Sequence, residues 1–210
     1  TVNLSDNGAS AGDNQNQITK TFTITTNSPP PPTISFTSTP TWTKDKPVQI
    51  TGNINGIDED YLSDYTFQYQ CQDKGDFNDL DLFFNNSSLD FSFNCFEEAT
   101  SQNGQIATFQ ILKGEIIASE NQNYLIDGNN PTISNLNYTP ESAGVKVNGT
   151  ITDSLSGVAG YKYICNGVSS NLISGANINF TCANYDTIAI QAQDNAGNFS
   201  AISEWSKPDL

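Results

Sequence analysis

The chain has 210 residues, of which 36% are apolar, and its 8 basic residues stand against 23 acidic ones for a formal net charge of −15. This charge argues against partners that are themselves anionic, namely nucleic acids and acidic membrane surfaces. The sequence has no histidine, which removes the usual activating base of serine and cysteine nucleophiles, so we predict that it is not an enzyme. No apolar run approaches the roughly 20 residues of a membrane-spanning helix, so we predict no membrane insertion.

Residues 1–26 have the pattern of the last hairpin of a β-sandwich. Residues 2–7 match residues 190–195 near the other end of the chain, and residues 18–24 alternate apolar and polar side chains as a strand does. An isolated two-stranded hairpin is only marginally stable in water. Two interpretations therefore stay open: the sequence is a slice through a longer array, or the hairpin completes the sandwich of a neighbouring subunit by β-strand addition.

A proline-rich segment and a repeated tetrapeptide mark the domain boundaries. Residues 27–31 hold most of a run of four prolines, which lack the backbone donor that a sheet interior requires, so this segment is predicted to be a polyproline linker. The tetrapeptide Pro-Thr-Ile-Ser occurs twice, at 32–35 and at 131–134. These repeats predict one domain over residues 32–127 and a second over residues 128–210.

The two predicted domains carry the same three alternating runs in the same order. In each domain the second and the third run end on a cysteine. Two copies of a β-rich pattern in one chain indicate a tandem array, for which a mechanical or adhesive function is more typical than catalysis. The runs are residues 48–54, 67–71 and 91–95 in the first domain and residues 145–151, 161–165 and 178–182 in the second.

The four cysteines fall as one pair in each repeat, Cys71 with Cys95 and Cys165 with Cys182. A metal site would need closely spaced cysteines or histidine partners, and the sequence has neither. In a sandwich the two cysteine-bearing runs of a repeat travel in the same direction, so their ends meet at one pole. We therefore predict one disulfide within each domain, with two pairs of free buried thiols as the alternative. Stable disulfides imply an oxidising, extracellular compartment.

Short strands and turn signals fill the second domain. Asn166-Gly167, Ser174-Gly175 and residues 194–198 are turn sequences between alternating segments, and no window keeps a helical period. This pattern is typical of an immunoglobulin-like (Ig-like) β-sandwich, so the predicted fold class is all-β, with tandem Ig-like sandwiches. The predicted strands of the second domain are A 132–138, B 145–152, C 159–165, D 168–173, E 177–182, F 186–193 and G 199–205; in the first domain, strand F is predicted at 106–112 and strand G at 122–126.

Two segments of the second domain carry a resemblance to a known family. The stretch Thr152-Asp-Ser-Leu-Ser-Gly-Val-Ala-Gly-Tyr161 leads into strand C, and Gln193-Asp-Asn-Ala-Gly-Asn198 forms the predicted F–G turn. Both resemble the Ig-like repeats of bacterial and archaeal surface proteins, over residues 130–205 closely and over residues 32–127 loosely. The resemblance implies a stalk, adhesin, surface-layer or filament component outside the cell, and it marks a fold rather than a function.

Acidic residues are predicted to meet where the first domain arrives at the second. In a sandwich the B–C and F–G loops share the pole that faces the preceding domain. This brings two aspartates and two asparagines of these loops towards three polar residues of the linker, namely Asp153, Asp194, Asn195 and Asn198 towards Asp127, Asn129 and Asn130. Carboxylate oxygens are the hard ligands that Ca²⁺ prefers, so we predict a calcium site that stiffens the junction. The alternative is that these side chains cap turns by accepting bonds from nearby backbone N–H groups. Residues 58–60 are a second acidic candidate, at the top of the first domain.

Asn-x-Ser/Thr sequons offer candidate sites of N-glycosylation. Asn85 and Asn86 lie in a polar insertion between the cysteines of the first domain, and Asn198 lies in a turn. Because insertions and turns run over the surface of a protein, these three asparagines are the predicted acceptors of a glycoprotein.

Together these patterns predict a structural segment of an extracellular appendage or stalk, in which tandem, disulfide-linked sandwiches carry tension and set spacing. The first alternative is a filament subunit that lends its leading hairpin to the next copy in a head-to-tail contact. The second is a binding module that recognises surface glycans through the insertion of the first domain. The expected partners are copies of the chain or adjacent Ig-like domains, and surface glycans in the last case.

Overall fold

The computed structural model describes residues 2–4, 20–22, 30–72, 75–85, 88–183 and 186–207. The chain divides into two compact units, residues 1–31 and residues 32–210. In the first unit, strands β1 (Val2–Leu4) and β2 (Lys20–Phe22) pair in antiparallel fashion. The other predictions for the hairpin, and most of those for the polyproline linker, lie outside the described residues.

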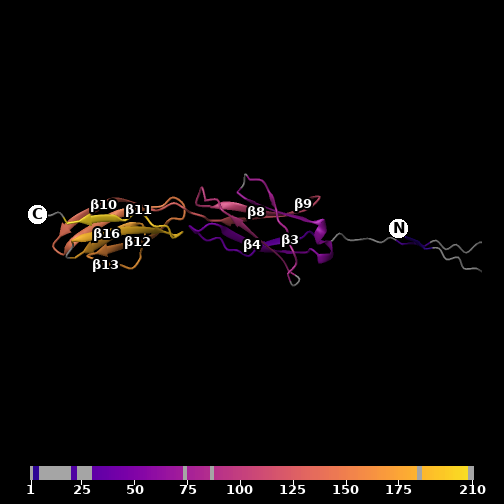
Figure 1. Ribbon diagram of the computed structural model, residues 1–210, viewed down its shortest axis with the longest axis horizontal. Coiled ribbons are helices and arrows are strands. Elements are labelled where there is room, and N and C mark those ends of the chain that lie inside the picture. The colour runs from indigo at the N-terminus through magenta and orange to yellow at the C-terminus, as the bar shows by residue number, and fades with distance from the viewer. Residues whose placement is uncertain are drawn as a thin grey trace, which may run out of the picture. The chain divides into compact units, whose positions relative to one another are not determined.

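The first sandwich of the second unit consists of two antiparallel sheets (Figure 1). One sheet has the strand order β3-β4-β7 and the other the order β6-β5-β8-β9. The strands are β3 (Thr33–Phe36), β4 (Val48–Asn55), β5 (Thr66–Cys71), β6 (Asn78–Asp79), β7 (Leu89–Cys95), β8 (Gln105–Lys113) and β9 (Glu115–Tyr124). The run of alternating residues predicted at 48–54 is thus a central strand, between β3 and β7.

Alternate residues of the strands build the core of the first sandwich. Along β7, Leu89, Phe91, Phe93 and Cys95 are buried while the residues between them are exposed, as expected for a strand with one face against a core. The ring of Phe91 stacks on that of Phe109 with centroids 4.1 Å apart. Such aromatic pairs contribute about 0.5–1.5 kcal/mol beyond their burial of apolar area.

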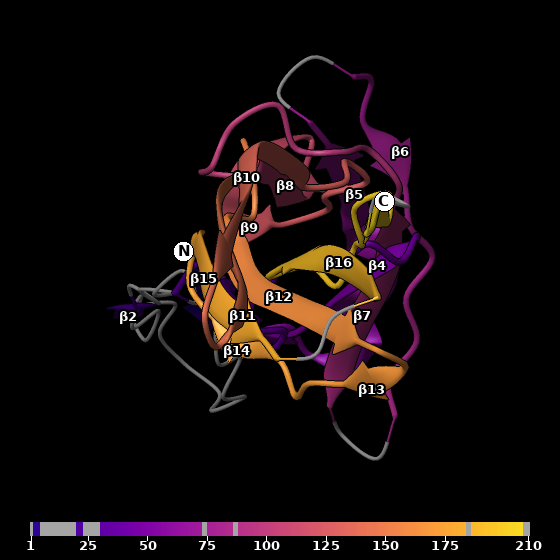
Figure 2. The same ribbon diagram turned by 90° about the vertical axis from the view of Figure 1, so that its left-hand side faces the viewer.

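The second sandwich repeats this plan with sheets of order β10-β11-β15 and β13-β12-β16-β17, which Figure 2 shows as two facing layers. Its core contains the fully buried Val145, Val147, Ile188, Ile190 and Ala192. The strands are β10 (Thr132–Glu141), β11 (Gly144–Thr152), β12 (Val158–Cys165), β13 (Val168–Ser169), β14 (Ile173–Ser174), β15 (Asn177–Cys182), β16 (Thr187–Asp194) and β17 (Ser203–Ser206). The predicted all-β fold class with tandem Ig-like sandwiches is confirmed.

The single strand D predicted at residues 168–173 is wrong, because the structure has two short strands there. They are β13 and β14, and both pair with β12. The physical reason lies at Gly160 of β12, because a Cβ there would collide with the backbone carbonyl of Ile173. The missing side chain lets β14 approach, so this segment joins the sheet of β12, β16 and β17.

Strand G of the first domain was predicted too late in the sequence. The structure places β9 at Glu115–Tyr124, directly after β8, with Gly114 at φ +77° in the turn between them. β9 lies at the edge of its sheet, and most of its side chains are exposed or half-buried, so the sequence shows little alternation there. The turn depends on Gly114, because a side chain strains a backbone with positive φ.

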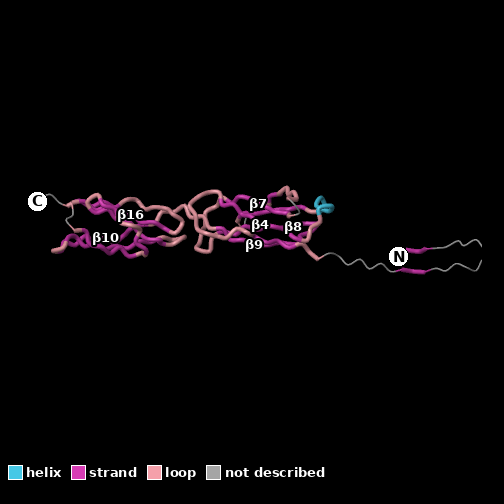
Figure 3. The backbone as a smooth tube through the Cα atoms, turned by 90° about the horizontal axis from the view of Figure 1, so that it is seen from below, coloured by secondary structure: helices cyan, strands magenta, loops and turns pink. Residues whose placement is uncertain are grey.

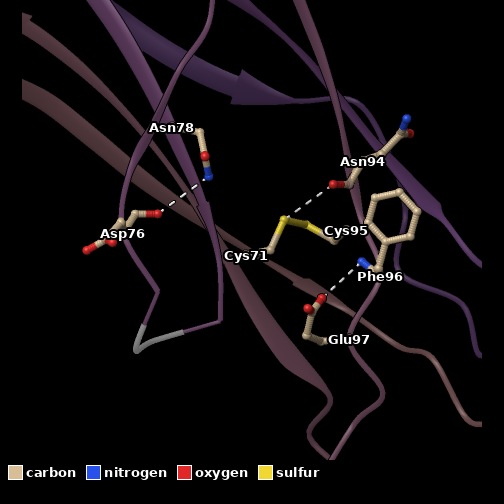
Figure 4. The surroundings of a disulfide bond; sticks show 7 residues. All are labelled: Cys71, Asp76, Asn78, Asn94, Cys95, Phe96 and Glu97. Atoms are coloured by element: carbon tan, nitrogen blue, oxygen red, sulfur yellow. Dashed lines mark hydrogen bonds between the residues drawn. A yellow bond between two sulfur atoms is a disulfide. The ribbon is translucent and has the colours of Figure 1, made fainter.

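Both predicted disulfides form, Cys71 with Cys95 and Cys165 with Cys182. The sequence separation of the paired cysteines is 24 in the first disulfide and 17 in the second. Figure 4 shows the first of them, which joins the end of β5 to the end of β7. The ends of these two strands, one from each sheet, therefore lie at the same pole of the sandwich, and the starts of β5 and β7 lie at the other.

Helical structure is confined to one short element in the part of the chain that the structure describes. It is a 3₁₀-helix, η1 (Glu59–Asp64), drawn in cyan in Figure 3. Asp58 caps it, since Oδ1 of Asp58 accepts a bond from the N–H of Asp60 at 3.2 Å. Among the described residues, no helix has the length and apolar character needed to cross a membrane.

Candidate functional site

Backbone hydrogen bonds hold the linker between the two sandwiches. The N–H of Asp127 donates to the carbonyl of Thr43 at 2.9 Å. The N–H of the next loop residue, Lys44, donates to the carbonyl of Ala196 in the turn between β16 and β17, at 3.2 Å. One loop of the first sandwich thus binds both the linker and the second sandwich.

Asp127 is fully buried, with 0% of its surface exposed, although its side chain is a carboxylate. Its Oδ1 accepts from the N–H of Asn129 at 2.8 Å, and its Oδ2 accepts from the N–H of Ser156 at 3.0 Å. Its backbone carbonyl accepts from Nδ2 of Asn198 at 2.7 Å. Asp127 therefore bonds to both loops of the second sandwich that face the linker.

Asp153 and Asp194 accept hydrogen bonds within those two loops, which follow β11 and β16. Oδ1 of Asp153, which follows β11, accepts from the N–H of Leu155 at 3.1 Å and from the N–H of Gly157 at 2.7 Å. Asp194, the last residue of β16, is buried, and its two carboxylate oxygens accept from the N–H and from Nδ2 of Asn198 at 2.8 and 2.9 Å. These are the turn-capping bonds predicted as the alternative to metal binding.

The three junction aspartates, Asp127, Asp153 and Asp194, also converge on one another. Each offers one carboxylate oxygen, and these oxygens all lie within 4.8 Å of one another. Within the described part of the chain, no lysine forms an ion pair with any of them. Buried carboxylates without a cationic partner are costly, and Ca²⁺, with oxygen ligands at about 2.3–2.6 Å, matches such an arrangement. The predicted meeting of the three residues is observed, and calcium binding stays a prediction.

Turn capping and cation binding do not exclude each other chemically. A carboxylate oxygen has two lone pairs, so an oxygen that accepts one N–H bond still has a site for a metal ion. Nearby amide oxygens and backbone carbonyls are further ligands of the kind that Ca²⁺ takes. The capping bonds hold the aspartate side chains in fixed positions, which lowers the conformational cost of binding an ion.

The second acidic candidate, residues 58–60, has a different arrangement. Asp58 caps η1, and Asp64 at the end of that helix receives a bond from Nζ of Lys113 at 3.2 Å. This bond raises the pKa of Lys113 above its usual value, and the ammonium group also lies 4.9 Å from the centroid of the Tyr65 ring. Among the described residues, the junction aspartates are the only set of three acidic side chains within metal-binding distance.

The predicted glycosylation sites separate into different environments. Asn198 is only 7% exposed, and its Nδ2 donates to the Asp127 carbonyl and to Asp194. An acceptor nitrogen must be reachable by the transferring enzyme, so the folded structure argues against Asn198 and assigns it to the junction. Asn85 is exposed and remains a predicted acceptor, whereas Asn86 lies outside the described residues.

Sequence reasoning missed several junction residues that contribute only backbone groups. Thr43 and Ser156 bind Asp127 through a carbonyl and an N–H, and no side-chain chemistry marks them in the sequence. Asn198 was predicted both at this junction and as a glycosylation acceptor, and its side chain bonds to Asp127 and Asp194 at the junction. The signal that identifies it is its position four residues after Asp194, because a short turn brings its amide back onto that carboxylate.

Comparison with solved structures finds the Ig-like fold in other proteins. The chain is similar to domains A168–A170 of titin, with a TM-score of 0.54 at 14% identity over 86% of this chain and 66% of that chain. The chain is also similar to bovine butyrophilin, with a TM-score of 0.41 at 10% identity over 85% of this chain and 100% of that chain. It is similar as well to an ICAM-5 D1–D4 ectodomain fragment, with a TM-score of 0.39 at 16% identity over 86% of this chain and 47% of that chain. No protein-family model and no curated protein sequence matches the chain. The likeness to titin supports the tandem Ig-like fold and nothing beyond the fold.

Proposed function

We propose that the chain is a structural segment of an extracellular appendage or stalk, in which Ig-like sandwiches carry tension and keep a fixed spacing. The bonding of Asp127 to both sandwiches is the observation that carries this proposal. A linker residue whose N–H, carbonyl and carboxylate are all bonded resists bending, whereas a free tether does not. The two disulfides favour an oxidising compartment and hence an extracellular location.

The path of the chain supports a role under tension. The chain enters the second sandwich at the pole of the linker, through β10, and leaves it through β17 at the pole of Cys165 and Cys182. A pull between these poles acts along the strands, so the hydrogen bonds of each ladder are strained together in shear. The disulfides then prevent the residues between the paired cysteines from extending.

Force spectroscopy on the full chain tests this mechanism. We expect two rupture events, and adding a reducing agent should lengthen the released chain by about 3.5 Å for each locked residue. The sequence separations of 24 and 17 residues make the two increments distinguishable. Extension without distinct ruptures, or increments that do not change on reduction, would contradict a tension-bearing role.

Nuclear magnetic relaxation on the full chain tests the stiffness of the junction. If the junction is rigid, backbone amides of both sandwiches report one common rotational correlation time. Asn198→Ala removes the donor to Asp127 and Asp194 and should let the two sandwiches tumble with different correlation times. Asn177→Ala, at an exposed position of β15, is the matched control and should change nothing. Independent tumbling of the unmodified protein would overturn the proposal of a fixed spacing.

Calcium at the junction aspartates is the second part of the proposal. Two thermal melts are compared, one with Ca²⁺ at about 1 mM and one with a chelator. The melting midpoint should be higher with calcium, because a ligand that binds only the folded state stabilises it. Asp153→Asn should abolish the difference. Asp58→Asn is the matched control, since the Asp58 side chain also accepts a backbone N–H bond, as the cap of η1, but belongs to no converging set of three acidic side chains among the described residues. A midpoint that is unchanged by the chelator removes calcium and leaves the aspartates as turn caps.

Polymerisation by hairpin donation remains a second candidate. The observation that favours it is the division of the chain, in which the paired strands β1 and β2 belong to a unit separate from the two sandwiches. A hairpin with two short strands gains stability when it adds to another sheet. Electron microscopy of the concentrated protein distinguishes the candidates, because donation gives regular filaments and a stalk segment stays monomeric.

A further inference from the structure

The insertion in the first sandwich forms one wall of an open groove. The groove has a volume of about 580 Å³ and lies between η1 and residues 79–83. Tyr65 and Thr66, at the start of β5, form part of its lining. In the second sandwich only Gly175 and Ala176 separate β14 from β15, so no comparable wall exists there.

One wall of the groove, residues 79–83, presents a row of exposed side chains at every second position. From Asp79 to Phe83 the side chains alternate, so that Asp79, Asp81 and Phe83 are exposed while Leu80 and Leu82 are half-buried against the core. Residues two apart in an extended chain are about 7 Å apart along its direction. The row therefore offers two carboxylates and then an aromatic ring at regular intervals, and the Phe83 side chain is 79% exposed.

The charged residues that line the groove are acidic. Glu59 on the η1 wall lines the same groove as Asp79 and Asp81, and no basic residue among the described ones lines it. Lys113, which lies over the ring of Tyr65 at the edge of the groove, is paired with Asp64. Neither Glu59 nor Asp81 takes part in a hydrogen bond or ion pair of its side chain within the described residues, and Asp79 accepts one bond from Gln68 at 2.8 Å. These carboxylates do not converge within metal-binding distance, in contrast to the junction aspartates. Separated negative charges suit an extended cationic ligand rather than a single metal ion.

We propose that this groove binds an extended basic peptide segment of a partner protein, with lysines opposite Asp79 and Asp81 and an apolar side chain against Phe83. The two-residue spacing of the row equals the spacing of side chains on one face of an extended peptide, so each positive group meets a carboxylate in register. The ring of Phe83 and the carboxylates together favour a cation with an apolar stem, which lysine has. The net charge of −15 attracts such a partner over a distance and repels a second copy of the chain.

Fluorescence anisotropy with the full chain tests the proposal. The probe is a dye-labelled octapeptide in which lysine and threonine alternate before a phenylalanine, and its counterpart has glutamate at every lysine position. We expect the lysine peptide to bind, and the glutamate peptide to bind at least tenfold more weakly. Binding should also weaken as salt rises from 50 to 500 mM, because the carboxylates are exposed to screening.

A double variant tests whether the peptide binds in the groove, and a second double variant is its matched control. Glu59→Gln combined with Asp81→Asn should weaken binding of the lysine peptide about fourfold, since each exposed ion pair contributes roughly a factor of two. Glu120→Gln combined with Glu141→Gln makes the same change in net charge on exposed residues outside the groove and should have a much smaller effect.

The aromatic contact is tested separately. Phe83→Ser should weaken the peptide, whereas Ile116→Ser, at a residue 58% exposed on β9, should not. Equal losses in the groove variants and in their controls would overturn the site. Binding of a neutral oligosaccharide in place of the lysine peptide would also overturn the proposal, in favour of a glycan-binding groove. Binding of neither ligand rejects the groove as a docking site and leaves the proposed structural role untouched.

Discussion

The two sandwiches differ most at the pole where each receives the preceding part of the chain. In the first sandwich this pole carries Lys113, which pairs with Asp64 and lies over the ring of Tyr65. In the second it carries Asp153 and Asp194 without a lysine. One fold thus pairs Asp64 with a lysine at this pole in one copy. In the other copy it holds three converging aspartates, two buried and one half-buried, of which the linker supplies Asp127. The loops rather than the strands decide which pole becomes a joint.

The cores differ at one equivalent position of the central strand. Gly52 in β4 and Gly149 in β11 both face a neighbour on the adjacent strand, Phe91 in the first sandwich and Ile178 in the second. The glycine makes room for the larger ring, which then stacks on Phe109. The same backbone plan therefore accommodates an aromatic side chain at this position in one copy and an aliphatic side chain in the other.

Removing each disulfide in turn gives the largest expected effect. Cys71→Ala with Cys95→Ala, or Cys165→Ala with Cys182→Ala, should each cost about 3 kcal/mol, since a crosslink of this loop length restricts the unfolded chain. Denaturant unfolding followed by hydrogen exchange measures the loss for each sandwich. We expect exchange to increase only in the sandwich that loses its bond. An equal increase in both would mean that the cores unfold as one unit, which contradicts the comparison.

The two glycines should respond unequally to alanine. A Cβ at Gly52 would lie 2.5 Å from the Ser35 carbonyl and within the ring of Phe91, and neither can move without disturbing the sheet or the core. At Gly149 the nearest atom is the end of the Leu136 side chain at 2.8 Å, which can turn away. We expect about 2–3 kcal/mol of destabilisation for Gly52→Ala and below about 1.5 kcal/mol for Gly149→Ala. Equal shifts of the urea unfolding midpoint in the two variants, each relative to the parent protein, would contradict this prediction.

The sequence predicted those features that local patterning determines. Apolar alternation located most strands, and the equal placement of cysteines at strand ends located both disulfides. The junction aspartates were also predictable, because two loops of a sandwich must share a pole with the linker. Each of these inferences uses a single strand period or a general property of the fold.

The features that sequence reasoning missed depend on backbone approach and on burial between distant segments. The pairing of β14 with β12 follows from the absence of a Cβ at Gly160, and β9 is hidden because an edge strand faces solvent on most of its length. The burial of Asn198 results from the arrival of Asp127, 71 residues earlier in the chain. The pole shared by the linker and the F–G loop predicted that Asn198 approaches Asp127, but no local pattern reports that the Asn198 side chain is buried there.

Alkaline pH should weaken the first sandwich through Tyr124. Burial raises the pKa of Tyr124 from 10.0 to about 12, with a further contribution from Glu97. Below pH 10 the hydroxyl is neutral in both states; above it the unfolded chain ionises first, so stability falls until the pH reaches about 12. Between these pH values the free energy of unfolding falls by at most about 1.4 kcal/mol per pH unit. Urea unfolding at pH 9 and 11 should show a smaller loss in Tyr124→Phe than in the parent protein.

The smallest effect concerns the hydroxyl groups of two buried tyrosines, at neutral pH. The hydroxyl of Tyr161 accepts from the N–H of Asn179 at 3.1 Å, whereas the hydroxyl of Tyr124 has no hydrogen-bond partner among the described residues. Tyr161→Phe leaves the half-buried N–H of Asn179 without its acceptor and should cost about 1 kcal/mol. Tyr124→Phe removes an unsatisfied group and should be neutral or slightly stabilising. A clear loss of stability in Tyr124→Phe would indicate a bound water that bridges this hydroxyl to its surroundings, and the two cores would then be alike in satisfying their buried tyrosines.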